Sequence, residues 1–160
     1  GMKQYSNADQ CYIGALSVFR KLSLGADTVH IANTLSNQGV NYSHMKQFSS
    51  ADQCYTEAIA ILRKLSQGDD TVMIAHTLFN QGVSYVNAGV MGEAREKLRE
   101  ALYIYRRLDP HNPQIEQCLT IIKAITILNY LRKQCGRFFT TLLFGIYRFT
   151  FAELINFINQ

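Results

Sequence analysis

The sequence predicts an all-α fold in which antiparallel helix pairs stack in a row, followed by a hydrophobic C-terminal helical segment. Residues 45–87 are a near copy of residues 2–44, with 27 identical residues among the 43 positions compared. Within each copy, apolar residues recur at spacings of three and four, as they do on one face of a helix. A repeat period between about 20 and 50 residues is typical of stacked repeat architectures.

The repeat also divides the chain. We expect a repeat array over residues 2–133, with units near 2–44, 45–87 and 88–133, and an apolar cap or association segment over residues 134–160. A chain of 160 residues has room for about three such units. With 48% hydrophobic and 18% charged residues, the composition is that of a folded chain.

The first helix of each copy is expected to begin at a serine. Ser6 and Ser49 each stand three residues before an aspartate, a pattern in which the serine oxygen accepts a hydrogen bond from a free backbone N–H. Gly25 and Gly68 follow the last apolar residues of these helices, where a glycine can take the left-handed conformation of a helix C-cap.

A second helix follows in each copy, with Asp27 and Asp70 as its expected N-caps. The third unit keeps the helical pattern from Ala94 to Leu108, and Asn112 with Pro113 then suits the start of a further helix that reaches about residue 133. Each repeat is therefore a helix pair.

The residues at the junction of the two copies carry a family resemblance. They are Leu35-x2-Gln38-Gly39-x2-Tyr42 followed by Ala51-x3-Tyr55, and the series recurs from Leu78 to Ala101. This series resembles the tetratricopeptide repeat (TPR) pattern W-x2-L-G-x2-Y…A-x3-F. The resemblance implies helix pairs stacked in a right-handed superhelix. Because the period is 43 residues, the repeats are similar to the long variety found in kinesin light chains.

The resemblance also implies protein–protein interaction, with a peptide held in a concave groove lined by the first helix of each TPR unit. Asn37 and Asn80 stand two residues before the repeat glycines, with Lys123 in the same register. An amide can donate to and accept from a peptide backbone, and a lysine suits an acidic group. The alternative is that the two asparagines bridge neighbouring helices. The groove candidates are Asn33, Asn37, Val40, His44, His76, Phe79, Asn80, Val83, Asn87 and Lys123.

Other classes of function find little support in the sequence. The four histidines lack H-E-x-x-H spacing, and no nucleophile, phosphate-binding or dinucleotide motif is present. We expect no enzyme activity, with a hydrolase as the remote alternative, and neither a cofactor nor a metal. The four cysteines are interpreted as buried free thiols. No basic and then apolar leader follows Met2, so the expected location is the cytoplasm.

Charge does not indicate a nucleic-acid partner. The formal net charge is +4, which is too low to predict nucleic-acid binding by itself. Basic residues recur at Arg20, Arg63 and Arg106, near the ends of equivalent helices. We interpret them as solvated cations that complement the negative ends of those helices.

The segment from residue 137 to residue 160 is apolar nearly all round a helix, so it requires burial or lipid. Its charge-free run, residues 138–147, is shorter than the roughly 20 residues of a membrane span, and membrane contact is not expected. It is expected to cap the array, fill the groove or mediate self-association. The alternative function is therefore that of a self-associating structural module.

We predict that the chain forms a homodimer and that removing the residues beyond Gly136 lowers its apparent mass, because the apolar segment supplies the contact. Multi-angle light scattering of both chains measures this. A monomer with and without the segment would contradict the prediction.

Overall fold

The structure, a computed structural model, describes residues 2–146, with side chains described from residue 4 to residue 133. This part of the chain contains helices and no strands, which confirms the predicted all-α class. The helices are α1 (Met2–Leu22), α2 (Val29–His44), α3 (Phe48–Leu65), α4 (Val72–Asn87), α5 (Met91–Leu108) and α6 (Gln114–Ile146). The chain divides into two compact units, Gly1–Asn112 and Pro113–Gln160, and each is described separately.

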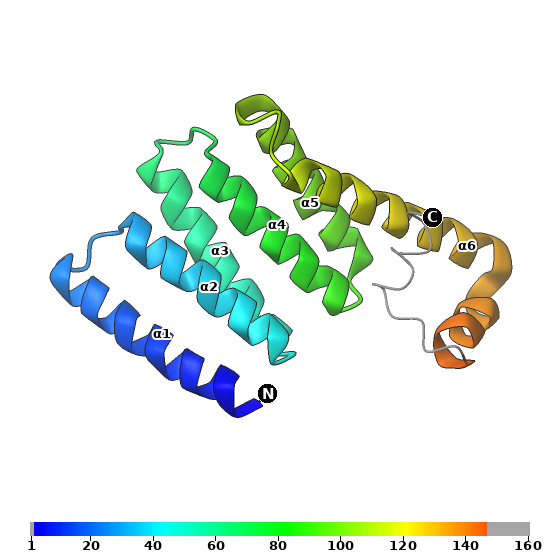
Figure 1. Ribbon diagram of the computed structural model, residues 1–160, viewed down its shortest axis with the longest axis horizontal. Helices are drawn as coiled ribbons and strands as arrows, with labels where there is room; N and C mark the ends of the chain where they lie inside the picture. Colours follow the sequence, from blue (N-terminus) through cyan, green and yellow to red (C-terminus); the bar gives the residue numbers. More distant parts are fainter. Residues whose placement is uncertain (1, 147–160) are drawn as a thin grey trace. The chain divides into compact units, whose positions relative to one another are not determined.

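Helices of the first unit pack in the order in which they follow one another. The most extensive contacts join α2 to α3 and α4 to α5, so these are the two complete helix pairs. Smaller contacts join α1 to α2 and α3 to α4, and α2 also touches α4. Figure 1 shows α2 and α4 side by side, with α3 and α5 behind them.

The core lies between the helices of each pair. On α3 the buried residues include Ala51, Tyr55 and Ala58, none of which is more than 1% exposed. On α5, 43 residues later, Ala94, Leu98 and Ala101 are completely buried. The same small–large–small pattern therefore packs both pairs.

Two glycines let the helices of each pair approach closely. A Cβ atom added at Gly39 of α2 would lie 2.8 Å from the ring of Tyr55. A Cβ added at Gly82 of α4 would lie 2.8 Å from Cγ of Leu98 and 3.3 Å from the backbone oxygen of Ala94. Since neither site has room for a larger residue, the helix separation depends on glycine at these positions.

The helix starts differ from those expected. Ser6 lies inside α1, which begins at Met2, and the N-cap of α3 is Gln47 without a side-chain cap, so neither predicted serine cap is correct. The caps of α2 and α4 are Thr28 and Thr71, whose side chains accept hydrogen bonds of 3.2 Å from backbone amides. Asp27 and Asp70, one residue before each threonine, do not cap these helices and instead form the ion pairs described below.

The helix ends agree with the prediction. Gly25 and Gly68 have φ angles of +81° and +92°, in the left-handed region that glycine adopts readily. Their backbone amides donate hydrogen bonds of 2.9 Å to the carbonyl oxygens of Arg20 and Arg63, five residues earlier. The glycines therefore close the ends of α1 and α3.

Two rows of ion pairs connect successive units. In the first row Arg20 binds Glu57 at 2.7 Å and Arg63 binds Glu100. Their side chains are about half exposed, so each pair contributes at most about 1 kcal/mol. The interpretation of these arginines as solvated cations at helix ends is incomplete, because it misses a carboxylate two helices further along the chain.

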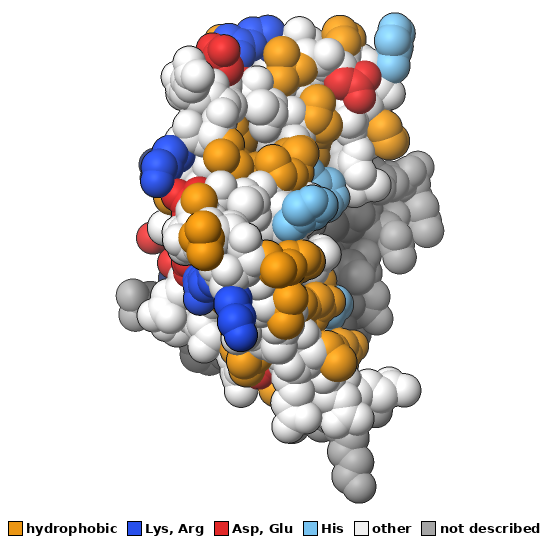
Figure 2. Space-filling view, turned by 90° about the vertical axis from the view of Figure 1, so that its left-hand side faces the viewer, with side chains coloured by type: hydrophobic (Ala, Val, Ile, Leu, Met, Phe, Trp, Pro, Cys, Tyr) orange, Lys and Arg blue, Asp and Glu red, His pale blue; other side chains and the backbone are white. Residues whose placement is uncertain are grey.

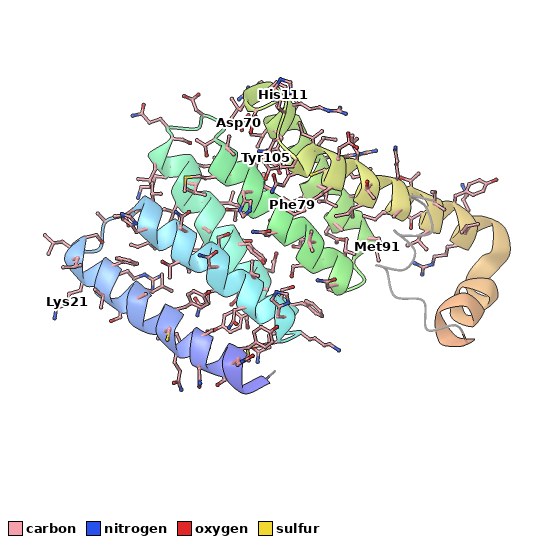
Figure 3. The ribbon with its side chains drawn as sticks, viewed as in Figure 1. Lys21, Asp70, Phe79, Met91, Tyr105 and His111 are labelled. Carbon is pink, nitrogen blue, oxygen red and sulfur yellow. The ribbon has the colours of Figure 1, made fainter. Side chains whose placement is uncertain are left out.

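The second row involves the aspartates that precede the threonine caps. Lys64 binds Asp27 at 2.7 Å, and Arg107 binds Asp70, in the loop between α3 and α4 (Figure 3), at 2.6 Å. Asp27 and Asp70 are therefore ion-pair partners and not N-caps, which corrects the prediction. Both rows repeat with the 43-residue period.

The second unit contains α6, a single helix that runs from Gln114 to Ile146 without interruption at the boundary expected near residue 133. The division into residues 2–133 and 134–160 stays a prediction. The side chains beyond residue 133, and all of residues 147–160, lie outside the described part of the chain, so the expected cap or association segment stays a prediction too. None of the helices described here is both long and apolar enough to span a membrane.

The cysteines differ from one another in burial. Cys118 is buried and Cys54 is half-buried, whereas Cys11 is exposed, so the expectation of a buried thiol is wrong for Cys11. Cys11 and Cys54 occupy the same repeat position, on α1 and α3. Their difference therefore reflects what covers each helix.

We predict that Gly82→Ala lowers the free energy of unfolding by about 1–3 kcal/mol, because the added methyl group overlaps Leu98. Gly14→Ala is the control: nothing lies within 4 Å of an added Cβ in the middle of α1, so alanine should raise stability by roughly 0.5–1 kcal/mol. Urea unfolding followed by circular dichroism measures both. Equal effects of the two substitutions would show that the close contact does not limit the packing.

Candidate peptide-binding surface

The predicted groove residues fall on three helices. Four lie on α2 and five on α4, and each is exposed or half-buried. The four on α2 are Asn33, Asn37, Val40 and His44, and the five on α4 are His76, Phe79, Asn80, Val83 and Asn87. Lys123 is exposed on α6, in the second unit, so its place in a common site stays a prediction.

Eight of these residues form two matching stripes. On α2 the positions are 33, 37, 40 and 44, and on α4 they are 76, 80, 83 and 87, a spacing that keeps them on one face of a helix. Phe79, midway along α4 (Figure 3), stands beside the second stripe. We call these eight residues together with Phe79 the α2–α4 stripe. Since α2 touches α4, the two halves lie on neighbouring helices.

The side-chain amides of Asn37 and Asn80 are not used to join helices. Asn80 Nδ2 lies 3.5 Å from Nδ1 of His76, one turn earlier on the same helix, which is long for a hydrogen bond. Within residues 4–133, no hydrogen bond connects either asparagine to another helix. The alternative that they bridge neighbouring helices therefore finds no contact to support it.

A buried polar contact holds each stripe helix on the helix before it. Gln38 of α2 donates from Nε2 to Oδ1 of Asp9 on α1 at 2.8 Å, and Gln81 of α4 makes the same bond to Asp52 of α3 at the same distance. Tyr85 also donates to Asp52, at 2.6 Å. The glutamines are only 4% and 2% exposed, so the aspartates supply the hydrogen-bond partner that water would supply to an exposed amide.

This contact explains a departure from the TPR pattern, because glutamine stands where leucine is usual. Asp9 and Asp52 were expected to be the acidic residues of helix-opening S-x-x-D patterns, whereas in the structure they accept hydrogen bonds from Gln38 and Gln81. One sequence feature could have predicted this contact. An Asp, a Gln and a Tyr each recur 43 residues later, and the Gln amide and the Tyr hydroxyl can both donate hydrogen bonds to the Asp carboxylate.

Burial changes the acidity of the groups in these contacts. The pKa of Tyr85 is raised from 10.0 to about 12, first by burial and then by its bond to the Asp52 carboxylate. The pKa of Tyr42 is raised to about 12 by burial and by Asp9. Burial likewise raises the pKa of the Cys54 thiol to about 11, which disfavours the thiolate that nucleophilic chemistry needs.

A pocket with a volume of about 330 Å³ adjoins the stripe on α2. It brings together three predicted residues with five that sequence reasoning missed. The predicted ones are Asn37, Val40 and His44, and the others are Gln4, Tyr5, Ala8, Tyr12 and Asn41. The ring of His44 stacks on Tyr5 at 5.5 Å between centroids. One signal was available, because Tyr12 occupies the repeat position of Tyr55.

A larger pocket, of about 600 Å³, lies among α1, α2 and α3. It contains the Arg20–Glu57 ion pair and the Cys54 thiol, and none of the predicted groove residues. Among the described residues there is no cluster of three or more His, Cys, Asp or Glu side chains that could hold a metal ion.

Residues 1–64, which include α1, α2 and nearly all of α3, match the family model of the tetratricopeptide repeat. Over these residues the chain is similar to tetratricopeptide repeats. No curated protein matches it significantly. Since residues 45–87 copy residues 2–44, the same likeness extends through α4. TPR units generally mediate protein–protein interaction, and their fold is generally a non-catalytic scaffold.

We predict that the free energy of unfolding falls as the pH rises from about 10 to about 12. The unfolded tyrosines lose their protons at a pKa near 10.0, whereas Tyr42 and Tyr85 in the folded chain keep theirs to about 12, so alkali favours the unfolded state in this window. Chemical denaturation at about pH 9 and about pH 11 measures the slope.

The double variant Tyr42→Phe with Tyr85→Phe should flatten this slope, and Tyr103→Phe, at an exposed position, should not. If the free energy of unfolding falls equally with pH in the double variant and in the parent chain, Tyr42 and Tyr85 are not the cause of the pH dependence.

Proposed function

We propose that this TPR protein is a non-enzymatic scaffold that binds an extended peptide segment of a partner on the α2–α4 stripe. The observation that carries the proposal is a pair of asparagines, Asn37, which is exposed, and Asn80, which is half-buried, because they recur in the same register on neighbouring helices. Their amides make no bond to another helix within the described residues. Two such groups can each donate to and accept from a peptide backbone.

The chemistry of the surface indicates which contacts dominate. Neither α2 nor α4 contains an Asp, Glu, Lys or Arg residue. The stripe offers amides, two imidazoles and the apolar side chains of Val40, Val83 and Phe79. The ligand is therefore expected to bind through its backbone and through apolar side chains.

The stripe is also held rigidly from behind. The bonds from Gln38 to Asp9 and from Gln81 to Asp52 fix α2 and α4 on the helices that precede them. A pre-formed surface loses less conformational entropy on binding than a flexible one. This supports recognition by the helices and not by the loops.

A peptide selected from a random library against the whole chain provides the probe. We predict that Asn80→Ala weakens its binding by roughly 10- to 100-fold, because the peptide backbone loses a buried hydrogen-bond partner. Isothermal titration calorimetry measures the affinity, and circular dichroism checks the fold.

Asn7→Ala is the matched control, since Asn7 is exposed on α1 and lies outside the stripe. Its affinity for the selected peptide should equal that of the parent chain. Unchanged binding by Asn80→Ala would place the ligand elsewhere and refute the proposed site.

A further inference from the structure

We infer that the pocket of about 600 Å³ between α1 and α3 binds a primary aliphatic ammonium group, carried by a lysine side chain of a partner or by a free amine. We call this pocket the amine pocket. It shares no residue with the α2–α4 stripe, so the inference is independent of the proposed peptide surface. It rests on a buried amide oxygen, a carboxylate without a cation, and apolar side chains beside them.

The amine pocket is enclosed by three helices, all of them described. Its walls are α1 and α3, and its floor is α2. Three residues of the α1 wall are exposed, and their equivalents on α3 are exposed too, although α2 and α4 both pack on α3. These residues are Ile13, Ser17 and Arg20 on α1, and Thr56, Ala60 and Arg63 on α3. The open side is therefore a feature of each repeat.

The floor of the pocket contains a buried hydrogen-bond acceptor. Gln38 is 4% exposed, and its Nε2 donates to Asp9. Its Oε1 accepts only from the Cys54 thiol, at 3.9 Å, within the described residues. A thiol is a weak donor, and a buried amide oxygen normally has a stronger one. An ammonium group supplies three N–H donors, so it matches the unused capacity of this oxygen.

The charges around this oxygen favour a cation. Arg20, the basic residue of the pocket, is bound to Glu57 at 2.7 Å, so these two charges compensate each other. Asp9 accepts from Gln38 and forms no ion pair within residues 4–133. The pKa of the Cys54 thiol is raised to about 11, first by burial and then by Glu57 and Asp9. The field of both carboxylates therefore reaches the pocket, where it stabilises a positive charge.

Charges elsewhere on this side of the molecule are matched in pairs. Figure 2 shows Lys and Arg side chains close to Asp and Glu side chains toward the left of the view, as the rows of ion pairs require. Among the described residues in view, no large patch has a single sign of charge. Attraction of an ammonium group therefore has to come from the pocket itself.

The remaining lining suits an aliphatic chain. Leu16 and Leu35 are 7% and 3% exposed, and both line the pocket together with Ile13. Leu35 stands three residues before Gln38, so the two lie on the same face of α2. A lysine side chain or an alkylamine covers apolar surface with its methylene groups while its ammonium group reaches polar partners.

The second repeat indicates the same type of group. Gln81 keeps the place of Gln38 and the bond to an aspartate, and its Oε1 accepts no hydrogen bond within the described part of the chain. The position of Cys54 is taken there by Lys97, which is half-buried on α5. One copy thus carries a lysine of its own where the other has a short side chain and a pocket.

The test uses the whole protein labelled with nitrogen-15 and two probes, pentylamine and the peptide acetyl-Ala-Ala-Lys-Ala-Ala-amide. Titration followed by amide chemical shifts should show half-saturation below about 10 mM for at least one probe, with shifts at Gln38 and Cys54. Pentanol, and the peptide with norleucine in place of lysine, lack the charge and should bind at least about tenfold more weakly. Whichever probe binds identifies the source of the ammonium group.

A matched pair of variants tests the carboxylate. Asp9→Asn removes the charge and keeps an oxygen that accepts from Gln38, and it should weaken binding of the probe at least about fivefold. Asp52→Asn is the control, because Asp52 accepts the same bond from Gln81 outside the amine pocket. It changes the net charge equally and should leave the affinity unchanged.

A second pair tests the position of the ammonium group. Cys54→Lys gives the first repeat the lysine of the second and should abolish binding, because it fills the pocket with a cation. Cys11→Lys, at the same repeat position on α1 and exposed, should not.

Three results would overturn the inference. They are no saturable binding of either amine probe, equal affinity for an amine and its uncharged analogue, and equal loss of binding in Asp9→Asn and Asp52→Asn. Comparing each amine with its uncharged analogue needs only the parent chain, so it decides the question even if a variant unfolds.

Discussion

The close contact between the two helices of each pair is the constraint on which the rest of the structure depends. At Gly39 and Gly82 an added Cβ would stand 2.8 Å from Tyr55 or Leu98, so α2 and α4 press one face directly onto α3 and α5. A helix that buries one face in this way leaves the opposite face at the surface. The exposed α2–α4 stripe, including Asn37 and Asn80, is therefore a consequence of how the pairs pack.

Contacts that join each helix pair to the helix before it are of two kinds, and they differ in what they contribute to stability. The bonds from Gln38 to Asp9 and from Gln81 to Asp52 involve buried amides. Leaving such an amide without its partner would lower the free energy of unfolding by about 1–3 kcal/mol. The ion pairs, such as that of Arg20 with Glu57, are half exposed and contribute at most about 1 kcal/mol each. The buried bonds therefore specify how each helix pair packs on the helix before it, and the ion pairs reinforce this packing.

The two ends of the repeat pattern on the stripe side are not equivalent. Asn80 is half-buried, whereas Asn37 is exposed. The pocket of about 330 Å³ adjoins the stripe at Asn37, Val40 and His44.

The sequence by itself determined the helix pairs, their period and the exposed stripe, because these follow from residue spacing along one helix. It also located the glycine helix ends at Gly25 and Gly68. Only the tertiary structure decided the partners: Asp27 pairs with Lys64 and leaves the cap to Thr28, and Asp9 accepts from Gln38. Such contacts join residues about 30 or more positions apart, and local patterns carry no information on which surfaces meet. The same holds for burial, since identical residues, Tyr12 and Tyr55, differ only in what lies on them.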